Sequence, residues 1–595
     1  MILPAFITKP NPDIYLTGSY LVLDFETYNN NKGDARHARN SIVTGVYYSS
    51  LCGWKEFDAN AASSPQELQK EIERVDVVVA QNAKFEIKWL IRLGLPIHKY
   101  LFYDTMLGDY VIAGNRGWDL DLDSVAARYG IESKASAVSK MIKGGVCPST
   151  IPFGLLRRYC QKDVEITRNI FLVQRQVLKN SGLLPVFFLR CLSTPVLADI
   201  EMVGMGVDRE LVVKKHCEFS EQHWETKEAI KELSGGIVPS GAVQKAHFLY
   251  GTLKFEELRD RRGRPIRGRP HKQFPEGIPK TDEVTILALK AKTATQKEYI
   301  RLCLIETELK KKINTYTLRF LQAGDVLYGT INQTISQTHR LTSSNPNLQN
   351  IDRTLKKLIK SRHKGWKIRS ADFKQLEFRA AAQLAQDKQA LEDIVGNADI
   401  HAYTAKVLTE AGQPTSRQEA KASTFKPLYG GSSGTEAEKR YYEAFKKKYW
   451  AIAQMQKEWT KEVLEKKQLR TISGLIFYWP DTEYTSSGYL QNTSKMYNYP
   501  VQMFATADIA PTSTCLLWHH IKAMGLNSFI INEVHDSVLL EEHPKESQEL
   551  GNLLEFVMSK YITEFLEKVI DYRINYPLEI EQKSCTNWDD NIETT

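Results

Sequence analysis

The stretch that decides the fold is Ser370-Ala-Asp-Phe-Lys-Gln-Leu-Glu-Phe-Arg379. It overlaps an apolar, strand-like run, so the pattern predicts that Asp372 lies at the end of a strand. Asp536 lies 164 residues further on, in a turn between two late strand-like runs. Two acids that converge from distant strands can hold two divalent metals for phosphoryl transfer. The three runs are Trp366–Asp372, Ser528–Glu533 and Ser537–Glu541.

Between these acids, Arg417, Lys421, Phe425 and Tyr429 recur every four residues. On a helix this spacing forms one slowly drifting stripe, with two cations at one end and two aromatic rings at the other. Such a stripe can bind a triphosphate and stack on a base. The alternative is an amphipathic packing face whose cations extend to solvent. Pro427 is expected to kink or end the helix near Phe425, because proline has no N–H to donate.

A second set of acids lies in the first third of the chain. Asp24 and Glu26 end a strand-like run, and alternation along a strand directs both carboxylates the same way. Glu86 follows another apolar run, and Tyr159 and Asp163 share one face of a helical pattern. Together they suit two hard cations, Mg²⁺ or Mn²⁺, although each piece alone is more often a solvent-facing pair. The runs are Tyr20–Thr27, Val75–Ala80, Lys84–Leu93 and Leu155–Val177.

In this order, the N-terminal clusters resemble the three motifs of the DnaQ-like 3′–5′ exonuclease superfamily. The resemblance implies that the acids hold two metals and that Tyr159 orients the attacking water. The second motif usually carries Asp, and Glu86 reaches one methylene further. A shift of about 1 Å in the position of a catalytic group can lower a rate about 10²-fold. We therefore expect an active exonuclease, with a rate that the longer Glu86 side chain can lower. The implied metal-site acids are Asp24, Glu26, Glu86 and Asp163.

The C-terminal segments resemble motifs A, B and C of the family A DNA polymerases, a group of bacterial repair polymerases and many phage replicases. The resemblance runs from about residue 20 to Trp588. It implies that Asp372 and Asp536 bind two Mg²⁺ or Mn²⁺ ions and that Glu377 is a steric gate against a ribose 2′-OH. The implied dNTP-binding residues are Arg417, Lys421, Phe425, Tyr429, His401 and Glu377. The implied DNA-binding residues are Arg340, Gln502, His535, Asn345 and Gln349.

This chain departs from the family pattern at three places. His339 replaces the usual Gly before Arg340, and Lys426-Pro427 replaces a Gly-apolar pair. Ser537 replaces the second acid of the third motif, whereas Asp536 is kept. We expect these changes to affect speed and fidelity more than the activity itself.

Pattern and resemblance together predict an α/β chain, with an RNase H-like exonuclease domain over residues 1–185 and a right-hand polymerase domain over residues 186–595. The thumb is expected at about 186–325, the palm at about 326–395 and 500–595, and the fingers at about 396–499. A helix over Pro195–Met202 is expected to be capped by Thr194. The first acids lie so close to the N-terminus that we expect no 5′-nuclease domain, as in phage replicative members of the family.

The composition is that of an ordinary globular protein, with 42% hydrophobic and 25% charged residues, which excludes a disordered or collagen-like chain. Eight scattered cysteines without a CxxC pair argue against a zinc finger. We find neither a secretory signal nor a membrane span, so we expect a cytoplasmic protein, in a bacterial host if the source is a phage.

The net charge of +8 is concentrated between Arg259 and Lys272, where the run alone carries +6. This run falls in the expected thumb. Our hypothesis is that it contacts DNA phosphates or docks a processivity or replisome factor, and the alternative is a solvated loop.

We therefore expect a proofreading DNA polymerase for phage genome replication that binds primer-template DNA and dNTPs. The main alternative is a 3′–5′ exonuclease whose C-terminal half mainly binds DNA, and the intact Asp372, Lys421 and Asp536 argue against it. A non-catalytic DNA-binding protein would not need both sets of acids. An RNA polymerase of the same fold is disfavoured by Glu377.

Overall fold

The computed structural model describes residues 2–132, 137–260, 263–431, 433–486 and 488–588. Within them the chain forms two compact units: residues 2–204, 328–350 and 363–588 make the first, and residues 205–327 and 351–362 make the second. All the candidate catalytic, dNTP-binding and DNA-binding residues lie in the first unit. None of the described helices is long and apolar enough to cross a membrane.

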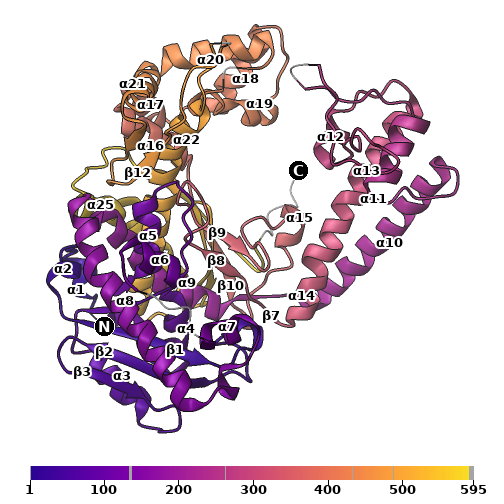
Figure 1. Ribbon diagram of the computed structural model, residues 1–595. Helices are drawn as coiled ribbons and strands as arrows, with labels where there is room; N and C mark the ends of the chain where they lie inside the picture. Colours follow the sequence, from indigo (N-terminus) through magenta and orange to yellow (C-terminus); the bar gives the residue numbers. More distant parts are fainter. Residues whose placement is uncertain (1, 133–136, 261–262, 432, 487, 589–595) are drawn as a thin grey trace. The chain divides into compact units, whose positions relative to one another are not determined.

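A five-stranded sheet forms the N-terminal part of the first unit, in the order β3-β2-β1-β4-β5 (Figure 1). Its central strand, β1 (Tyr20–Thr27), pairs antiparallel with β2 (Ile42–Ser49) and parallel with β4 (Val77–Ala80). Burial of the apolar half of β1 fixes its register, because a slip by one residue would turn every side chain to the opposite face. The outer strands are β3 (Gly53–Phe57) and β5 (Phe102–Asp104).

Helices α4 (Lys84–Arg92) and α8 (Phe153–Asn180) pack against this sheet. α8 buries a stripe with four-residue spacing that includes Cys160 and Val164. Tyr159 and Asp163 each precede a member of that stripe. The predicted strand over Tyr20–Thr27 is confirmed, as are the two predicted helices, the second of which is longer than expected.

Helix α9 (Leu184–Val203) also belongs to the first unit, where it packs against α4 and α23 (Ala510–Met524). It is buried along nearly its whole length, as expected for a helix inside a core. The predicted helix start at Thr194 is wrong, because α9 runs through Pro195 and the Thr194 hydroxyl donates to the Arg190 carbonyl oxygen (3.4 Å). The second unit begins at residue 205, whereas we expected the thumb to begin near 186.

A four-stranded antiparallel sheet, in the order β13-β14-β10-β15, carries the C-terminal acids. The inner strand β10 (Lys367–Phe373) pairs with β14 (Ser537–Glu542) and β15 (Ile580–Cys585), and β14 pairs with β13 (Phe529–Val534). The strand before Asp372 and the late strand pair are therefore confirmed. Ladders on both sides of β10 hold its end in place.

Helix α19 (Arg417–Thr424) packs against α18 (Ile400–Glu410). α19 ends where the proline was expected to end it, with Phe425 as its C-cap residue, and Pro427–Tyr429 form a short 3₁₀ turn. The single helical stripe is therefore interrupted. Arg417 and Lys421 share the helix, whereas Tyr429 lies beyond it.

In the second unit, α10 (Arg209–Leu233) and α13 (Ala294–Lys311) pack together. The basic run between them forms isolated bridges and no described helix, as its composition predicted. Neighbouring acids pair with part of its positive charge, and Arg261 and Arg262 lie outside the described residues. The ion pairs are Arg264–Asp260, Arg267–Glu257 and Arg267–Glu276.

Candidate active sites

Asp372 and Asp536 lie side by side at one end of the C-terminal sheet. Ser537 faces Asp372 across the β10–β14 ladder, and the Phe373 N–H donates to the Asp536 carbonyl oxygen (3.2 Å). Burial raises the pKa of Asp536, and the charge of Arg340 opposes this shift. Carboxylate oxygens at adjacent backbone positions are ligands that suit Mg²⁺ or Mn²⁺.

Side chains from other segments surround Asp536. The Arg340 guanidinium lies 2.8 Å from the His535 Nδ1 atom, and Gln502 donates to the Glu377 carboxylate (3.4 Å). Burial raises the pKa of Glu377, and the charge of Asp536 adds to the shift. The structure thus brings together a predicted metal ligand, the predicted steric gate and three predicted DNA-binding residues.

The other two predicted DNA-binding residues are less directly placed. Gln349 donates to the Glu533 carbonyl oxygen (3.3 Å) and so fixes its segment against β13. Asn345 is exposed just beyond β9 (Thr342–Ser344).

The predicted phosphate-binding residues gather where α18 and α19 meet. Arg417 donates to the Asp399 carboxylate (2.5 Å), and the His401 Nδ1 atom lies 2.9 Å from the Thr424 hydroxyl. Burial lowers the pKa of His401, and the cations Arg417 and Lys421 lower it further. The charges of Arg417 and Lys421 therefore both reach His401, so the three predicted phosphate-binding groups lie close together. The four-residue spacing of the stripe does not predict the pairing of Arg417 with Asp399.

Phe425 connects this cluster to the segment that follows Asp372. Its ring centroid lies 5.6 Å from that of His401 and 5.8 Å from that of Phe378, which belongs to α16 (Leu376–Ala385). Tyr429 is half-buried in the 3₁₀ turn. The aromatic contacts thus join the predicted dNTP-binding residues to α16, the helix that follows Asp372.

His339, one of the departures from the family pattern, is buried. Its backbone has φ 60°, its Nε2 atom lies 3.0 Å from the Gly114 carbonyl oxygen, and its ring lies against Tyr110 at 4.1 Å between centroids. Burial lowers the pKa of His339 to about 3, so the imidazole is neutral near pH 7. Glycine, the usual residue at this position in the family pattern, adopts a positive φ without strain. His339 adopts it while its ring contacts Gly114 and Tyr110 in the N-terminal part of the unit.

Glu533, two residues before His535, is a buried acid that the sequence did not single out. Its exposed fraction is 2%, and Thr514 is the neighbouring side chain that favours its charged form. Burial raises the pKa of Glu533 from 4.5 to about 8. Between these pH values the folded protein holds a proton that the unfolded chain lacks, so this group makes stability fall as the pH rises from about 4.5 to about 8.

We therefore expect Glu533→Gln to stabilise the protein more at pH 8 than at pH 5.5, by up to ~3 kcal/mol, because glutamine cannot ionise. Thermal unfolding at the two pH values measures this difference. The exposed Glu549→Gln is the matched control. An equal shift of the unfolding midpoint at both pH values would contradict the assignment.

In the N-terminal part, Asp24, Glu26 and Asp163 each place one carboxylate oxygen within 4.8 Å of the others. Burial raises the pKa of all three, and repulsion among the carboxylates adds to the shift of Glu26 and Asp163. A divalent cation would relieve this repulsion. The geometry and the hard oxygen donors fit the predicted metal site.

Glu86, in the first turn of α4, is buried and lies outside this three-acid group. The charge of Asp24 contributes to raising the pKa of Glu86, after the larger effect of burial, so the two carboxylates are neighbours. Burial raises the pKa of Tyr159, and Asp163 and Glu26 raise it further. Cys160, to which the sequence pattern assigned no role, donates from its thiol to the Asp24 Oδ2 atom (3.2 Å).

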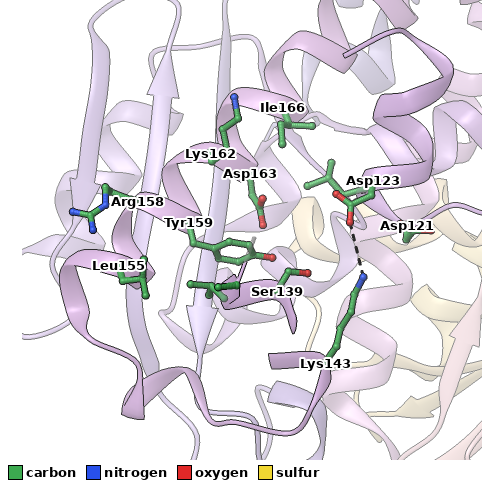
Figure 2. A pocket seen from close by; sticks show the side chains of 13 residues that line it. Asp121, Asp123, Ser139, Lys143, Leu155, Arg158, Tyr159, Lys162, Asp163 and Ile166 are labelled. Carbon is green, nitrogen blue, oxygen red and sulfur yellow. Dashed lines mark ion pairs between the residues drawn. The ribbon is translucent and has the colours of Figure 1, made fainter. Parts of the chain in front are cut away.

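A pocket of about 330 Å³ opens beside Asp163, one of the three close carboxylates (Figure 2). One wall is α8, from which Tyr159 and Asp163 are directed into the pocket. The other wall comes from α6 (Leu122–Arg128), its preceding residue Asp121, and α7 (Ala137–Lys143). A cavity of this size suits a nucleotide rather than a duplex, since small-molecule sites span roughly 300–1,000 Å³.

The sequence model of one protein family, DNA polymerase family A, matches residues 209–590, which is more than half of the chain. This chain belongs to DNA polymerase family A. The family membership implied by the three C-terminal motifs is therefore confirmed.

Among the relatives of this family A chain are three bacterial proteins named DNA polymerase I. The Pseudomonas aeruginosa protein is 26% identical and matches 86% of this chain and 56% of its own length, and the Bacillus subtilis protein is 24% identical over 98% and 65%. The Aquifex aeolicus protein is 25% identical over 86% and 88%. The chain thus spans 56% of the length of the Pseudomonas aeruginosa protein and 65% of that of the Bacillus subtilis protein.

The solved POL domain of Pol1 from M. smegmatis, in complex with DNA primer-template and dNTP, has the same fold. It aligns with 99% of both chains at a TM-score of 0.77 and 20% identity. This likeness confirms the predicted fold class, a mixed α/β chain that contains a polymerase domain.

Proposed function

We propose that the chain is a template-directed DNA polymerase that extends a primer 3′ end with dNTPs. The observation that carries this proposal is the convergence of Asp372 and Asp536 at one end of a sheet, beside Arg340, His535 and Glu377. The relatives named DNA polymerase I and the solved complex with primer-template and dNTP support it.

In this proposal Asp372 and Asp536 hold two Mg²⁺ or Mn²⁺ ions, which when bound neutralise the charge of the reacting phosphates. Arg417, Lys421 and His401 bind the triphosphate, and Phe425 and Tyr429 contact the incoming nucleotide or the template. A further set of polar residues binds the DNA, and two of them, Arg340 and Gln502, probe the minor groove, where all base pairs offer acceptors. That set is Arg340, Gln502, His535, Asn345 and Gln349.

Primer extension with Mg²⁺, offering either dNTPs or rNTPs, tests the polymerase proposal. We expect dNTP-dependent extension that follows the template sequence. A wild-type protein that does not extend a primer with dNTPs would contradict the proposal.

Glu377→Ala is expected to raise rNTP use relative to dNTP use about 10- to 100-fold, because removal of the carboxylate side chain opens space for the 2′-OH. The measurement is the ratio of kcat/KM for rNTP and dNTP with the same primer-template. Glu377→Gln keeps the size of the side chain and is the control. If the alanine variant keeps the wild-type ratio, Glu377 is not the steric gate.

We also propose that the N-terminal part degrades single strands from the 3′ end. The three close carboxylates and the adjoining pocket carry this proposal. Asp24, Glu26 and Asp163 would hold metals, Glu86 would assist them, and Tyr159 would orient the attacking water. Loss of a 5′-labelled single strand with Mg²⁺ and without dNTPs is the test, and an intact strand would contradict it.

The two proposals together describe a proofreading polymerase. The alternative, an exonuclease whose C-terminal half mainly binds DNA, is disfavoured by the intact pair of C-terminal acids. A role in phage genome replication, a processivity or replisome factor at the basic run, and a cytoplasmic location stay predictions from the sequence.

A further inference from the structure

The exonuclease-like pocket is lined by three cations, Lys143, Arg158 and Lys162, of which Lys143 lies on the wall opposite Tyr159 and Asp163. Lys143, the last residue of α7, lines the pocket and forms an ion pair with Asp123 of α6 at 3.9 Å. Figure 2 shows Lys143 reaching toward Asp123, whereas Arg158 and Lys162 of α8 extend away from Tyr159 and Asp163. Of the three lining cations, Lys143 is therefore the one whose charged end extends across the pocket in this view.

The charge balance of the pocket calls for such a cation. Asp24, Glu26 and Asp163 gather at one side, and the charge of Asp123 reaches Asp163 from the other, since it contributes to the raised pKa of that residue. A phosphodiester that enters between these acids is repelled by all of them. Metal ions would neutralise the charge on the α8 side, and Lys143 supplies a positive charge on the opposite side.

The ion pair between Lys143 and Asp123 is weak enough for Lys143 to leave Asp123 and pair with another anion. The Lys143 side chain is 70% exposed and that of Asp123 is 42% exposed, and exposed pairs at this distance contribute little to stability. Lysine carries a compact charge on a flexible stem, so its ammonium group can move from one anion to another. The pocket also contains apolar side chains that can contact a sugar and base, namely Leu122, Val138, Leu155 and Ile166.

We propose that Lys143 binds a backbone phosphate of the single strand whose 3′ end occupies this pocket, and that it releases Asp123 when it does so. The proposal rests on the exonuclease function proposed above. Lys143 acts in substrate binding, so its removal affects the affinity for the strand more than the rate of the chemical step.

The experiment measures KM and kcat for removal of nucleotides from a single-stranded oligonucleotide by the full chain at several salt concentrations. Lys143→Ala is expected to raise KM about tenfold and to leave kcat within about threefold, a low-end value for a hydrogen bond to a charged group. The slope of log KM against log salt should fall by up to ~0.7, the value for one lost phosphate contact on a single strand. Lys143→Arg should restore both values.

Lys140→Ala is the matched control, because Lys140 lies on α7 and is exposed but does not line the pocket. Asp123→Asn, which frees Lys143 from its partner, should lower KM. The proposal is overturned if Lys143→Ala has the KM and salt slope of the wild type and of Lys140→Ala.

A binding measurement separates this inference from the exonuclease proposal. Fluorescence anisotropy of a labelled trithymidylate in Ca²⁺ needs no cleavage, and Lys143→Ala should weaken binding about tenfold, with the same loss of salt slope. If the wild type binds the trithymidylate, Lys143→Ala binds it about tenfold more weakly, and the wild type never degrades the strand, the exonuclease proposal fails and the role of Lys143 stands. If the wild type degrades strands and Lys143→Ala binds them equally well, the role of Lys143 fails and the exonuclease proposal stands.

Discussion

Asp536→Ala is expected to lower the kcat of primer extension by about 10³-fold or more, on the scale lost when a group that stabilises transition-state charge is removed. Asp536 lies next to Asp372 through the β10–β14 ladder, and Ser537 replaces the second acid of that motif. If Asp372 and Asp536 hold the metals as proposed, no carboxylate at position 537 can compensate for the loss of Asp536. The measurement is single-turnover extension of a primer by one nucleotide with Mg²⁺.

The control for this variant is its own exonuclease-like site, which lies on a different sheet of the same unit. Degradation of a single strand should stay within about twofold of the wild type, because distant sites without shared partners are independent. Asp536→Asn keeps the shape of the side chain and should lose nearly as much extension activity as the alanine variant. Extension at the wild-type rate by Asp536→Ala would refute the assignment of the polymerase site.

Asp24→Ala is expected to lower the rate of single-strand degradation by about 10³-fold or more, by the same electrostatic argument. Asp24 is one of the three acids within 4.8 Å of one another, and its charge also acts on Glu86. Removal of this side chain thus takes away one proposed metal ligand and one charge that raises the pKa of Glu86. The measurement is the loss of a 5′-labelled strand in the absence of dNTPs.

Glu56→Ala is the matched control for Asp24→Ala. Glu56 lies on β3 of the same sheet, where it is exposed and pairs with Arg157. It should keep the wild-type rate of degradation, and both variants should keep primer extension. If Asp24→Ala degrades strands as fast as Glu56→Ala does, the three-acid group is not the exonuclease site.

These two experiments also decide between the functions left open by the sequence. Loss of one activity at a time shows that each set of acids catalyses its own reaction. If Asp24→Ala alone abolishes all activity and Asp536→Ala has no effect, the C-terminal half mainly binds DNA, which is the alternative that the intact acids disfavour.

Local patterns predicted the elements that carry the sites. The strand over Tyr20–Thr27 and the late strand pair are where the alternation of apolar residues placed them. The end of α19 before Pro427 followed from the missing N–H of proline. The pattern failed at Thr194, because a helix buried on all sides tolerates a proline where a solvent-exposed helix would end. Tertiary packing there overrides the local signal.

The sequence by itself determined which side chains could perform the chemistry, because acids at strand ends and cations at helical spacing are recognisable from residue types and intervals alone. Only the tertiary structure decided which of them meet. The contacts of Arg417 with Asp399, of Cys160 with Asp24 and of His339 with Gly114 join segments separated by up to 225 residues. The physical reason is that periodicity reports the direction of a side chain relative to its own helix or strand, whereas the partner depends on how separate elements pack.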